Sequence, residues 1–352
     1  MSDHLSSSDE DMEEMLDLIE VPKSIAYFEE IVPQFSDELY IQHFRLTREM
    51  SEDLANRFAD SEYYTWQEGD SEKVTPLKYI VVFLWFTANE ATSFREVSDR
   101  FHITKSTLFK IVRRVTFFLS NLSPEIIKWP EDLEKLEIEE HFRHRDFPGV
   151  IGIIDGTHIR IDKPKEDPDS YLNRKHFYSI QAQVVCDHKR RIRDIFVGYP
   201  GSVHDSRVLR TSPLHETLPE KCGDLYVLGD SGYPCLKNLL TPFKDNGHLT
   251  RRQINYNYVH SRNRYIIEHC FGIMKQKFRQ LYHLKIKDIE LIVHFIRACA
   301  VLHNLSLDVT FVADEEIVPE NIIVLNEDDY PDRDDRNGVA IREAIMNNLR
   351  LV

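Results

Sequence analysis

The sequence predicts an α/β protein in which an all-α, helix-turn-helix-like region precedes a sheet-forming domain. Two observations carry this prediction. Residues 35–136 repeat apolar side chains at helical spacing, whereas residues 150–161 form an apolar run that starts to alternate after Asp155. The second pattern is typical of a strand that is buried on both faces and then emerges towards solvent. Because an unpaired carboxylate is costly to bury there, Asp155 is the first candidate metal ligand.

The composition is that of a chain with a sizeable core and no membrane segment. At 352 residues and 42% hydrophobic content, the chain is long enough for two domains of ordinary size. The five cysteines lack CxxC spacing, which speaks against zinc modules and a disulfide framework and favours a reducing compartment. The longest apolar run, residues 79–86, is too short to cross a bilayer, so we expect a soluble, intracellular protein.

The charge is divided unevenly along the chain. The net charge is −15 overall, but residues 1–30 carry −9 and residues 307–352 carry −8, which leaves the middle close to +2. This composition predicts that residues 1–25 are a disordered acidic tail and that residues 308–352 are an acidic tail with a short terminal helix. The core can therefore present a phosphate-binding surface although the whole chain is acidic.

Residues 26–140 are expected to form the helical domain. Ser36 can cap one helix, and Thr75 before Pro76 opens another that is apolar nearly all round and belongs in a core.

Within it, residues 93–119 have the layout of a helix-turn-helix, with a tight turn at residues 102–104 and an amphipathic second helix. The polar face of the second helix carries four basic residues, Lys105, Lys110, Arg113 and Arg114. One interpretation places this helix in the major groove of DNA. The other is an ordinary helical pair with a solvated basic face, and the sequence leaves both open.

The chain changes to strands after Pro148. Residues 177–187 and 192–198 alternate apolar and polar side chains around a basic turn, so together with residues 150–161 they predict an antiparallel meander. A helix starts near Ser206, and a short apolar strand then ends in Asp230.

The last part of the chain is helical after a poorly periodic insertion over residues 234–259. A long helix from Ser261 carries Glu268, and another covers residues 289–305. The expected order of elements is that of a ribonuclease H-like fold: three strands, a helix, a fourth strand that ends in an acid, and a late helix with a Glu. In that fold, two parallel neighbouring strands bring their acids together and the late helix lays its Glu against them.

Three acids brought together in this way suit phosphodiester chemistry. Cleavage or transfer needs charge neutralisation on the phosphate and a nucleophile at neutral pH, and two divalent ions supply both. Oxygen ligands from Asp155, Asp230 and Glu268 suit Mg²⁺ or Mn²⁺. On the late helix, one stripe combines the acid with a glycine and two bases, Glu268, Gly272, Lys275 and Arg279. Such a stripe can ligate metal and follow a phosphate backbone.

Each acid also has a purely structural interpretation. Asp155 can cap a turn, Asp230 can form an Asx-turn, and Glu268 can be the i,i+4 ion-pair partner of Arg264. Asp205 can cap the helix that follows it, and this role competes closely with a metal role. Placement at strand positions favours function for Asp155 and Asp230.

Four motifs carry a resemblance to a known family: IDGTHIRI, YPGSVHDSRVLR, LGDSGYP and NRYIIEHCFGIMKQKFR, in this order. Over residues 147–307 the chain resembles the transposases of the PIF/Harbinger superfamily and the nuclease proteins derived from them. The resemblance implies a DDE endonuclease domain of ribonuclease H-like fold that cleaves DNA with a divalent metal. It makes Asp155, Asp230 and Glu268 the catalytic acids and adds Asp205 as a further metal ligand. The NRK of residues 173–175 also resembles a family motif, without a role that the sequence provides.

The sequence therefore predicts a nuclear, metal-dependent DNA endonuclease, and it leaves a second location in the cytoplasm open. Lys275, Arg279 and Arg262 are expected to position the DNA backbone. The resemblance implies a Myb-like DNA-binding protein as partner, and homo-oligomerisation stays open. The competing expectations are a domesticated DNA-binding or scaffold protein that no longer cuts, and a metal phosphohydrolase of small substrates, which the basic helix stripe disfavours.

Overall fold

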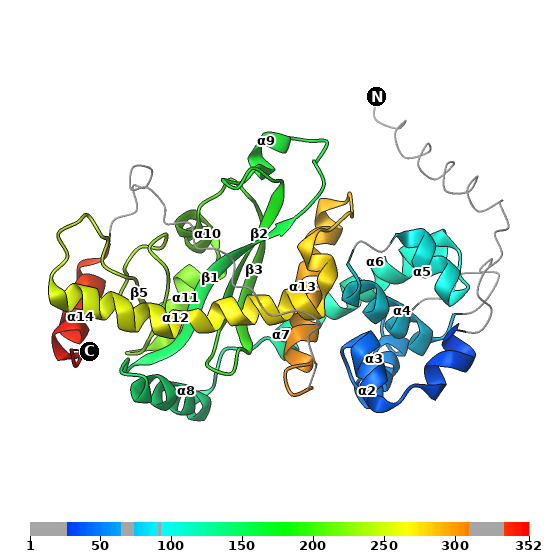
Figure 1. Ribbon diagram of the computed structural model, residues 1–352, viewed down its shortest axis with the longest axis horizontal. Helices are drawn as coiled ribbons and strands as arrows, with labels where there is room; N and C mark the ends of the chain where they lie inside the picture. Colours follow the sequence, from blue (N-terminus) through cyan, green and yellow to red (C-terminus); the bar gives the residue numbers. More distant parts are fainter. Residues whose placement is uncertain (1–26, 65–73, 91–92, 310–333, 352) are drawn as a thin grey trace.

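The structure is a computed structural model that describes residues 27–64, 74–90, 93–309 and 334–351. It is a mixed α/β molecule with a five-stranded sheet, and the N-terminal helices gather at one end of it (blue and cyan in Figure 1). The tail predicted for residues 1–25 lies outside the described residues, as does much of the one predicted for residues 308–352.

The strands follow the order β3-β2-β1-β4-β5 across the sheet. Their bounds are β1 (Val150–Arg160), β2 (Ser179–Cys186), β3 (Ile192–Pro200), β4 (Tyr226–Leu228) and β5 (Leu239–Leu240). The first three strands are antiparallel neighbours, which confirms the predicted meander. Strand β4 runs parallel to β1, and β5 runs parallel to β4. Strand β5 lies within the segment for which the sequence predicted no regular structure.

Strand β1 is the centre of the sheet and carries the first candidate acid. Its first five residues are all buried, because β2 and β4 flank it and the helices α8 (Asp132–His144) and α12 (Arg251–Lys277) also contact it. Burial becomes partial at Asp155. The strand therefore presents this carboxylate where the apolar core ends.

The N-terminal helices share a core with the sheet. They are η1 (Tyr27–Ile31), η2 (Val32–Gln34), α2 (Asp37–Phe44), α3 (Arg48–Ala59), α4 (Pro76–Ala88), α5 (Phe94–Phe101) and α6 (Lys105–Asn121). Ser36 and Thr75 cap α2 and α4 as predicted, and α4 is buried along most of its length. Helix α6 packs against α13 (Ile289–Leu305), which in turn contacts β3, and one continuous apolar cluster runs through both parts.

Short helices fill the connections between the larger elements. These are α7 (Ser123–Ile126), α9 (Pro168–Tyr171), α10 (Asp205–Thr211) and α11 (Pro213–Cys222). Helix α10 begins directly after the loop that follows β3, so its first residue, Asp205, reaches the end of the sheet where Asp155 lies.

Helix α12 (yellow in Figure 1) crosses the sheet and begins ten residues before the predicted start. The predicted start at Ser261 and the irregular assignment of residues 251–259 are wrong, because Thr250 and Gln253 form a reciprocal capping box that starts the helix at Arg251. The helix ends at Lys277 and a short 3-10 turn, η3 (Arg279–Tyr282), follows. In the described part of the chain, no helix combines the length and the apolar composition that crossing a membrane requires.

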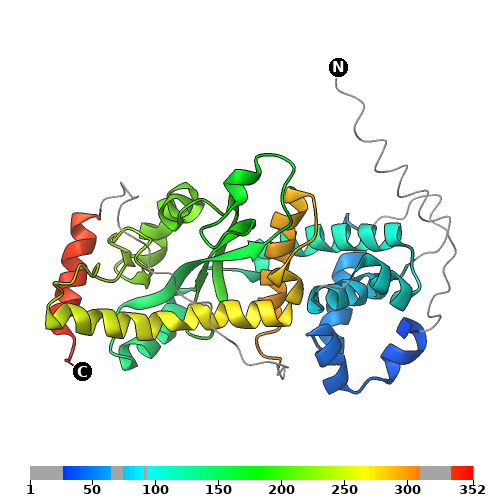
Figure 2. The same ribbon diagram turned by 45° about the horizontal axis from the view of Figure 1, so that its top comes forward.

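The C-terminal helix α14 (Arg336–Asn348, red in Figure 2) docks on the start of α12 and on β5. At Gly338 an added Cβ atom would lie 2.5 Å from the backbone carbon of Leu236, so only glycine allows this approach. The guanidinium group of Arg342 lies 4.4 Å from the centre of the Phe243 ring. These last described residues are therefore part of the folded unit.

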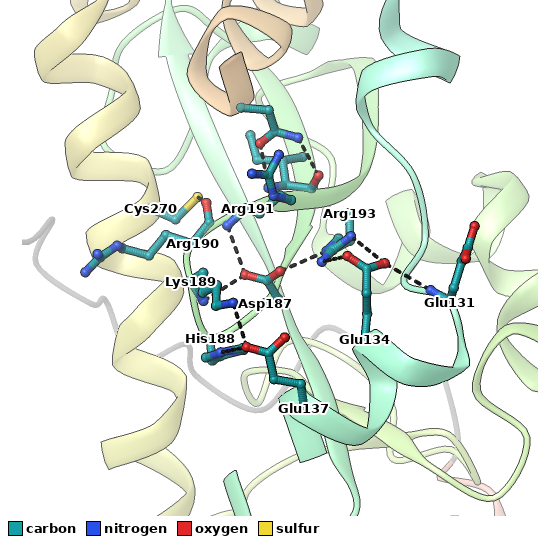
Figure 3. Close-up of polar contacts among 12 residues, drawn as sticks. Glu131, Glu134, Glu137, Asp187, His188, Lys189, Arg190, Arg191, Arg193 and Cys270 are labelled. Atoms are coloured by element: carbon teal, nitrogen blue, oxygen red, sulfur yellow. Dashed lines mark hydrogen bonds and ion pairs between the residues drawn. The ribbon is translucent and has the colours of Figure 1, made fainter. Parts of the chain in front are cut away.

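The basic turn between β2 and β3 is held by a buried carboxylate (Figure 3). Asp187 is only 1% exposed and accepts hydrogen bonds from the backbone N–H groups of Lys189 and Arg191, at 2.8 and 3.0 Å. It also pairs with Arg193 Nε at 2.8 Å, and Arg193 reaches Glu134 on α8 at 2.7 Å. Arg193 of β3 thus ties the turn and the sheet to α8.

Candidate active site

The register of the sheet brings Asp155 and Asp230 to the same level. Ile153 of β1 pairs with Leu228 of the parallel strand β4, and each acid follows its partner residue by two positions. Two neighbouring parallel strands therefore deliver two carboxylates to one edge, as the sequence predicted. Oδ1 of Asp230 also accepts a hydrogen bond of 2.9 Å from the backbone N–H of Gly232, which is the Asx-turn contact considered as its structural role.

Asp205 joins these two acids from the start of α10. An added Cβ atom at Gly232 would lie 3.1 Å from Asp230 Oδ1 and 3.4 Å from Asp205 Oδ2, so both carboxylates face the same glycine. Gln181 of β2 donates a hydrogen bond to Asp205 Oδ1. The residue at the cap position of α10 is His204, and no side chain caps this helix. The capping role considered for Asp205 is therefore wrong, and its carboxylate points to the other acids.

Glu268 reaches this group through Arg264, one turn earlier on α12. Nη1 of Arg264 lies 2.6 Å from Asp155 Oδ2, and Nη2 lies 2.8 Å from Glu268 Oε1. The Arg264 side chain is only 8% exposed. The i,i+4 pair that the sequence offered as a structural role for Glu268 is thus present, and the same guanidinium group links Glu268 to Asp155.

Burial and mutual repulsion raise the pKa values of the acids. Desolvation raises the pKa of Asp155 to about 7, with the charge of Asp230 adding to it and Arg264 opposing it. Desolvation, then repulsion by Asp230 and Asp155, raises the pKa of Asp205 well above its usual value. Desolvation also raises the pKa values of Asp230 and Glu268, against the charge of Arg264. The site concentrates more negative charge than one guanidinium group compensates.

The four acids line a cavity of about 220 Å³ together with basic and polar side chains. The lining also includes Arg174, Lys175, His204 and, from α12, the buried Lys275. Acidic and basic side chains therefore line the same cavity, an arrangement that suits a ligand with both a cation and an anionic group.

The donor set fits a hard divalent cation. Carboxylate oxygens are the ligands that Mg²⁺ and Mn²⁺ prefer, and a cation would relieve the repulsion that raises the pKa values of these acids. Within the described ranges, no three His, Cys, Asp or Glu side chains already converge closely enough to hold a metal ion. Arg264 supplies the positive charge instead, in contact with Asp155 and Glu268.

The structure separates the residues near α12 that the sequence predicted to contact the DNA backbone. Lys275 lines the cavity and donates to the carbonyl oxygen of His158 at 3.1 Å. Arg279 lies beyond the end of α12, so the stripe predicted to run from Glu268 to Arg279 stops at Lys275. Arg262 donates to the carbonyl oxygen of Arg145 at 2.7 Å and does not line the cavity.

Helix α6, which carries four of the predicted DNA contacts, packs against α13, and α13 in turn contacts β3 (Figure 1). The apolar face of α6 is buried as predicted. Arg113 is half exposed and lies 3.8 Å from Asp288, whereas Arg114 reaches the hydroxyl of Tyr79 at 3.4 Å. Lys105 is partly buried and Lys110 is exposed. None of the four lines the acidic cavity, and their contact with DNA stays a prediction.

The comparisons with known proteins agree with the geometry. Residues 154–304 match a family model described as DDE superfamily endonuclease. The Mus musculus protein named "Putative nuclease HARBI1" is 32% identical over 246 residues, which cover 68% of this chain and 69% of that protein. Its Homo sapiens counterpart is 29% identical over the same coverage.

A plant protein is similar as well. The Arabidopsis thaliana "Protein ALP1-like" is 27% identical over 231 residues, which cover 60% of this chain and 56% of that protein. No solved structure matches the chain. The matched region contains all four acids, most of β1, the strands β2 to β5, all of α12 and most of α13. The chain therefore belongs to the Harbinger transposase-derived family of DDE superfamily endonucleases.

Proposed function

We propose that this protein is a metal-dependent DNA endonuclease with a ribonuclease H-like catalytic domain. The observation that carries the proposal is the convergence of Asp155, Asp205 and Asp230 in one cavity, with Glu268 joined to them through Arg264. The strand order, with β4 parallel to β1 and the meander on the other side, supports the fold assignment.

The residues of the cavity would have separate roles in the reaction. Asp155, Asp205, Asp230 and Glu268 would hold two divalent ions, Mg²⁺ or Mn²⁺. Such ions supply charge neutralisation of the phosphate and a nucleophile at neutral pH. Gln181 orients Asp205, and the backbone N–H groups of Gly156 and Gly232 orient the other two aspartates. Lys275 lines the same cavity as Glu268, where it can contact the phosphate backbone.

The setting of the activity belongs to the same proposal. A nuclear protein that acts on DNA, with the cytoplasm open as a second location, fits the nuclease names of the relatives. A Myb-like DNA-binding partner would suit an acidic chain whose basic surface is modest. Helix α6 would provide a second DNA contact through its basic residues Lys105, Lys110, Arg113 and Arg114. Arg262 and Arg279 remain candidates for contact with the DNA backbone.

Nicking of supercoiled plasmid by the purified chain, with Mg²⁺ or Mn²⁺ and with EDTA as control, tests the proposal. The variant Glu268→Gln keeps the size of the side chain and removes the charge, so we expect it to lose nicking by at least about 100-fold. The variant Glu137→Gln is the matched control, since it makes the same substitution at an exposed glutamate outside the cavity. Equal nicking by wild type and Glu268→Gln would overturn the proposal.

One observation favours a second candidate, a domesticated protein that binds DNA and does not cut. Arg264 already pairs with Asp155 and Glu268, so two of the acids have a positive partner without any metal. Under this alternative, the purified chain would bind DNA with either metal present and show no nicking, with or without a partner protein.

A further inference from the structure

The connection between β1 and β2 is anchored by a buried asparagine that the catalytic proposal does not use. Asn173 is 4% exposed, and its Oδ1 accepts hydrogen bonds from the N–H groups of Lys175 and Phe177, at 2.9 and 3.3 Å. Its Nδ2 donates to Ser179 Oγ at 2.9 Å. One side chain therefore fixes the backbone on both sides of Arg174, so the position of this residue is set by the fold.

The loop that follows β3 packs against the same connection between β1 and β2. The backbone N–H of Gly201 donates to Ser179 O at 2.8 Å, and that of Ser202 donates to Ser170 O at 3.1 Å. An added Cβ atom at Gly201 would lie 2.9 Å from the carbonyl oxygen of Tyr171. The two loops, residues 170–179 and 201–202, thus form a rigid rim of the cavity, which has no space for even a methyl group at Gly201.

The rim presents two cations to the acidic cavity. Arg174 and Lys175 are both exposed and both line it. Arg174 contacts His204, with its Nη2 2.6 Å from the Nε2 atom. A guanidinium group carries five N–H donors in a planar fork, so it can hold a phosphate and a histidine together.

Arg174 and Lys175 differ from Arg264 in exposure. Arg264 contacts two carboxylates directly and is buried, whereas Arg174 and Lys175 are exposed. Exposed cations that line the same cavity as the acids attract a polyanion and offset the repulsion that the acids exert on it.

We propose that Arg174 and Lys175, held in place by Asn173, form a phosphate clamp that seats a nucleic-acid backbone across the acidic cavity. The proposal rests on the proposed function for the purpose of the clamp, but it assigns a binding site to residues outside the acid group. The clamp would contact a phosphate next to the one that is cleaved, and it would read no base sequence.

Binding of a fluorescein-labelled duplex, measured by anisotropy in Ca²⁺ over a series of salt concentrations, tests the clamp without requiring cleavage. We expect Arg174→Ala and Lys175→Ala each to weaken binding by about 3–10-fold, and each to reduce the slope of log K against log salt by about 1. Lys237→Ala is the matched control, because it removes one half-exposed cation that does not line the cavity. Binding and salt slopes equal to those of Lys237→Ala would overturn the clamp.

Asn173 provides a second, charge-neutral test. As a positioning residue, Asn173→Ala should weaken duplex binding although it removes no charge, in protein that melts as a single cooperative unit. A wild-type affinity in this variant would contradict its assigned role. The clamp and the enzyme fail separately: nicking that depends on Glu268 with unchanged binding in Arg174→Ala rejects only the clamp, whereas weakened binding without any nicking rejects only the endonuclease.

Discussion

Arg264 Nη1 lies 2.6 Å from Asp155 Oδ2, across 109 positions of the sequence. The same guanidinium group contacts Glu268 at 2.8 Å, so one buried cation joins the central strand to the long helix. Arg264 is therefore an internal counter-ion at the place where the proposed mechanism puts metal ions. Replacing Arg264 should show whether the guanidinium group and a metal ion neutralise the same carboxylates.

The variant Arg264→Gln should lower the stability of the metal-free protein at pH 7.5 by about 3 kcal/mol, because it leaves buried carboxylates without a positive partner. Added Mg²⁺ should then raise the melting temperature more in the variant than in the wild type. Scanning calorimetry with EDTA and with Mg²⁺ measures both effects. Arg262→Gln is the control, and an identical Mg²⁺ effect in Arg264→Gln and wild type would contradict the counter-ion role.

The raised pKa of Asp155 predicts how stability depends on pH. Its pKa of about 7 in the folded protein exceeds the usual value for an aspartate. The contribution of Asp155 to the free energy of unfolding is therefore fully present below about pH 4 and is lost as the pH rises through about 7. Between pH 5.5 and 8, metal-free protein should therefore lose stability through this site, by about 2–4 kcal/mol.

Divalent metal should reverse this loss, because only ionised carboxylates bind it. We expect the stabilisation by Mg²⁺ to grow from pH 5.5 to pH 8 in the wild type and to grow less in Asp155→Asn. Chemical denaturation at both pH values measures it. A stabilisation that is independent of pH would show that these acids do not bind the ion.

The basic turn of Figure 3 gives a prediction about stability away from the site. Asp187→Ala removes a buried acceptor of two backbone N–H groups and the partner of Arg193, so we expect a loss of about 3 kcal/mol. Glu137→Ala removes the exposed pair with Lys189 and a 3.9 Å contact with His188, and it should change little. Urea denaturation compares the two, and equal effects would contradict the structural role of Asp187.

The sequence predicted the aspartates of the site because their signals are local. An apolar run that ends at Asp155 and a second that ends at Asp230 define strands, and the parallel register of β1 and β4 then brings the two together. The meander followed from alternation in the same way.

The rest of the site depends on contacts that no local pattern encodes. The spacing of Arg264 and Glu268 indicates an i,i+4 pair, but the bond to Asp155 requires the packing of α12 on β1. The start of α12 was predicted too late because its first turns bury polar residues such as Asn255, so apolar periodicity is weak there. Arg174 and Lys175 were visible only as a motif without a role.

The most direct test of the central claim, that Asp155 is a metal ligand of a nuclease, is metal-dependent rescue of Asp155→Cys. Mg²⁺ binds oxygen ligands and accepts sulfur poorly, whereas the transition-metal ion Mn²⁺ tolerates a thiolate better. We predict that Asp155→Cys does not nick supercoiled plasmid with Mg²⁺ and recovers measurable nicking with Mn²⁺, while Asp155→Ala stays inactive with both. Nicking by Asp155→Ala at the wild-type rate in Mg²⁺ would contradict the claim.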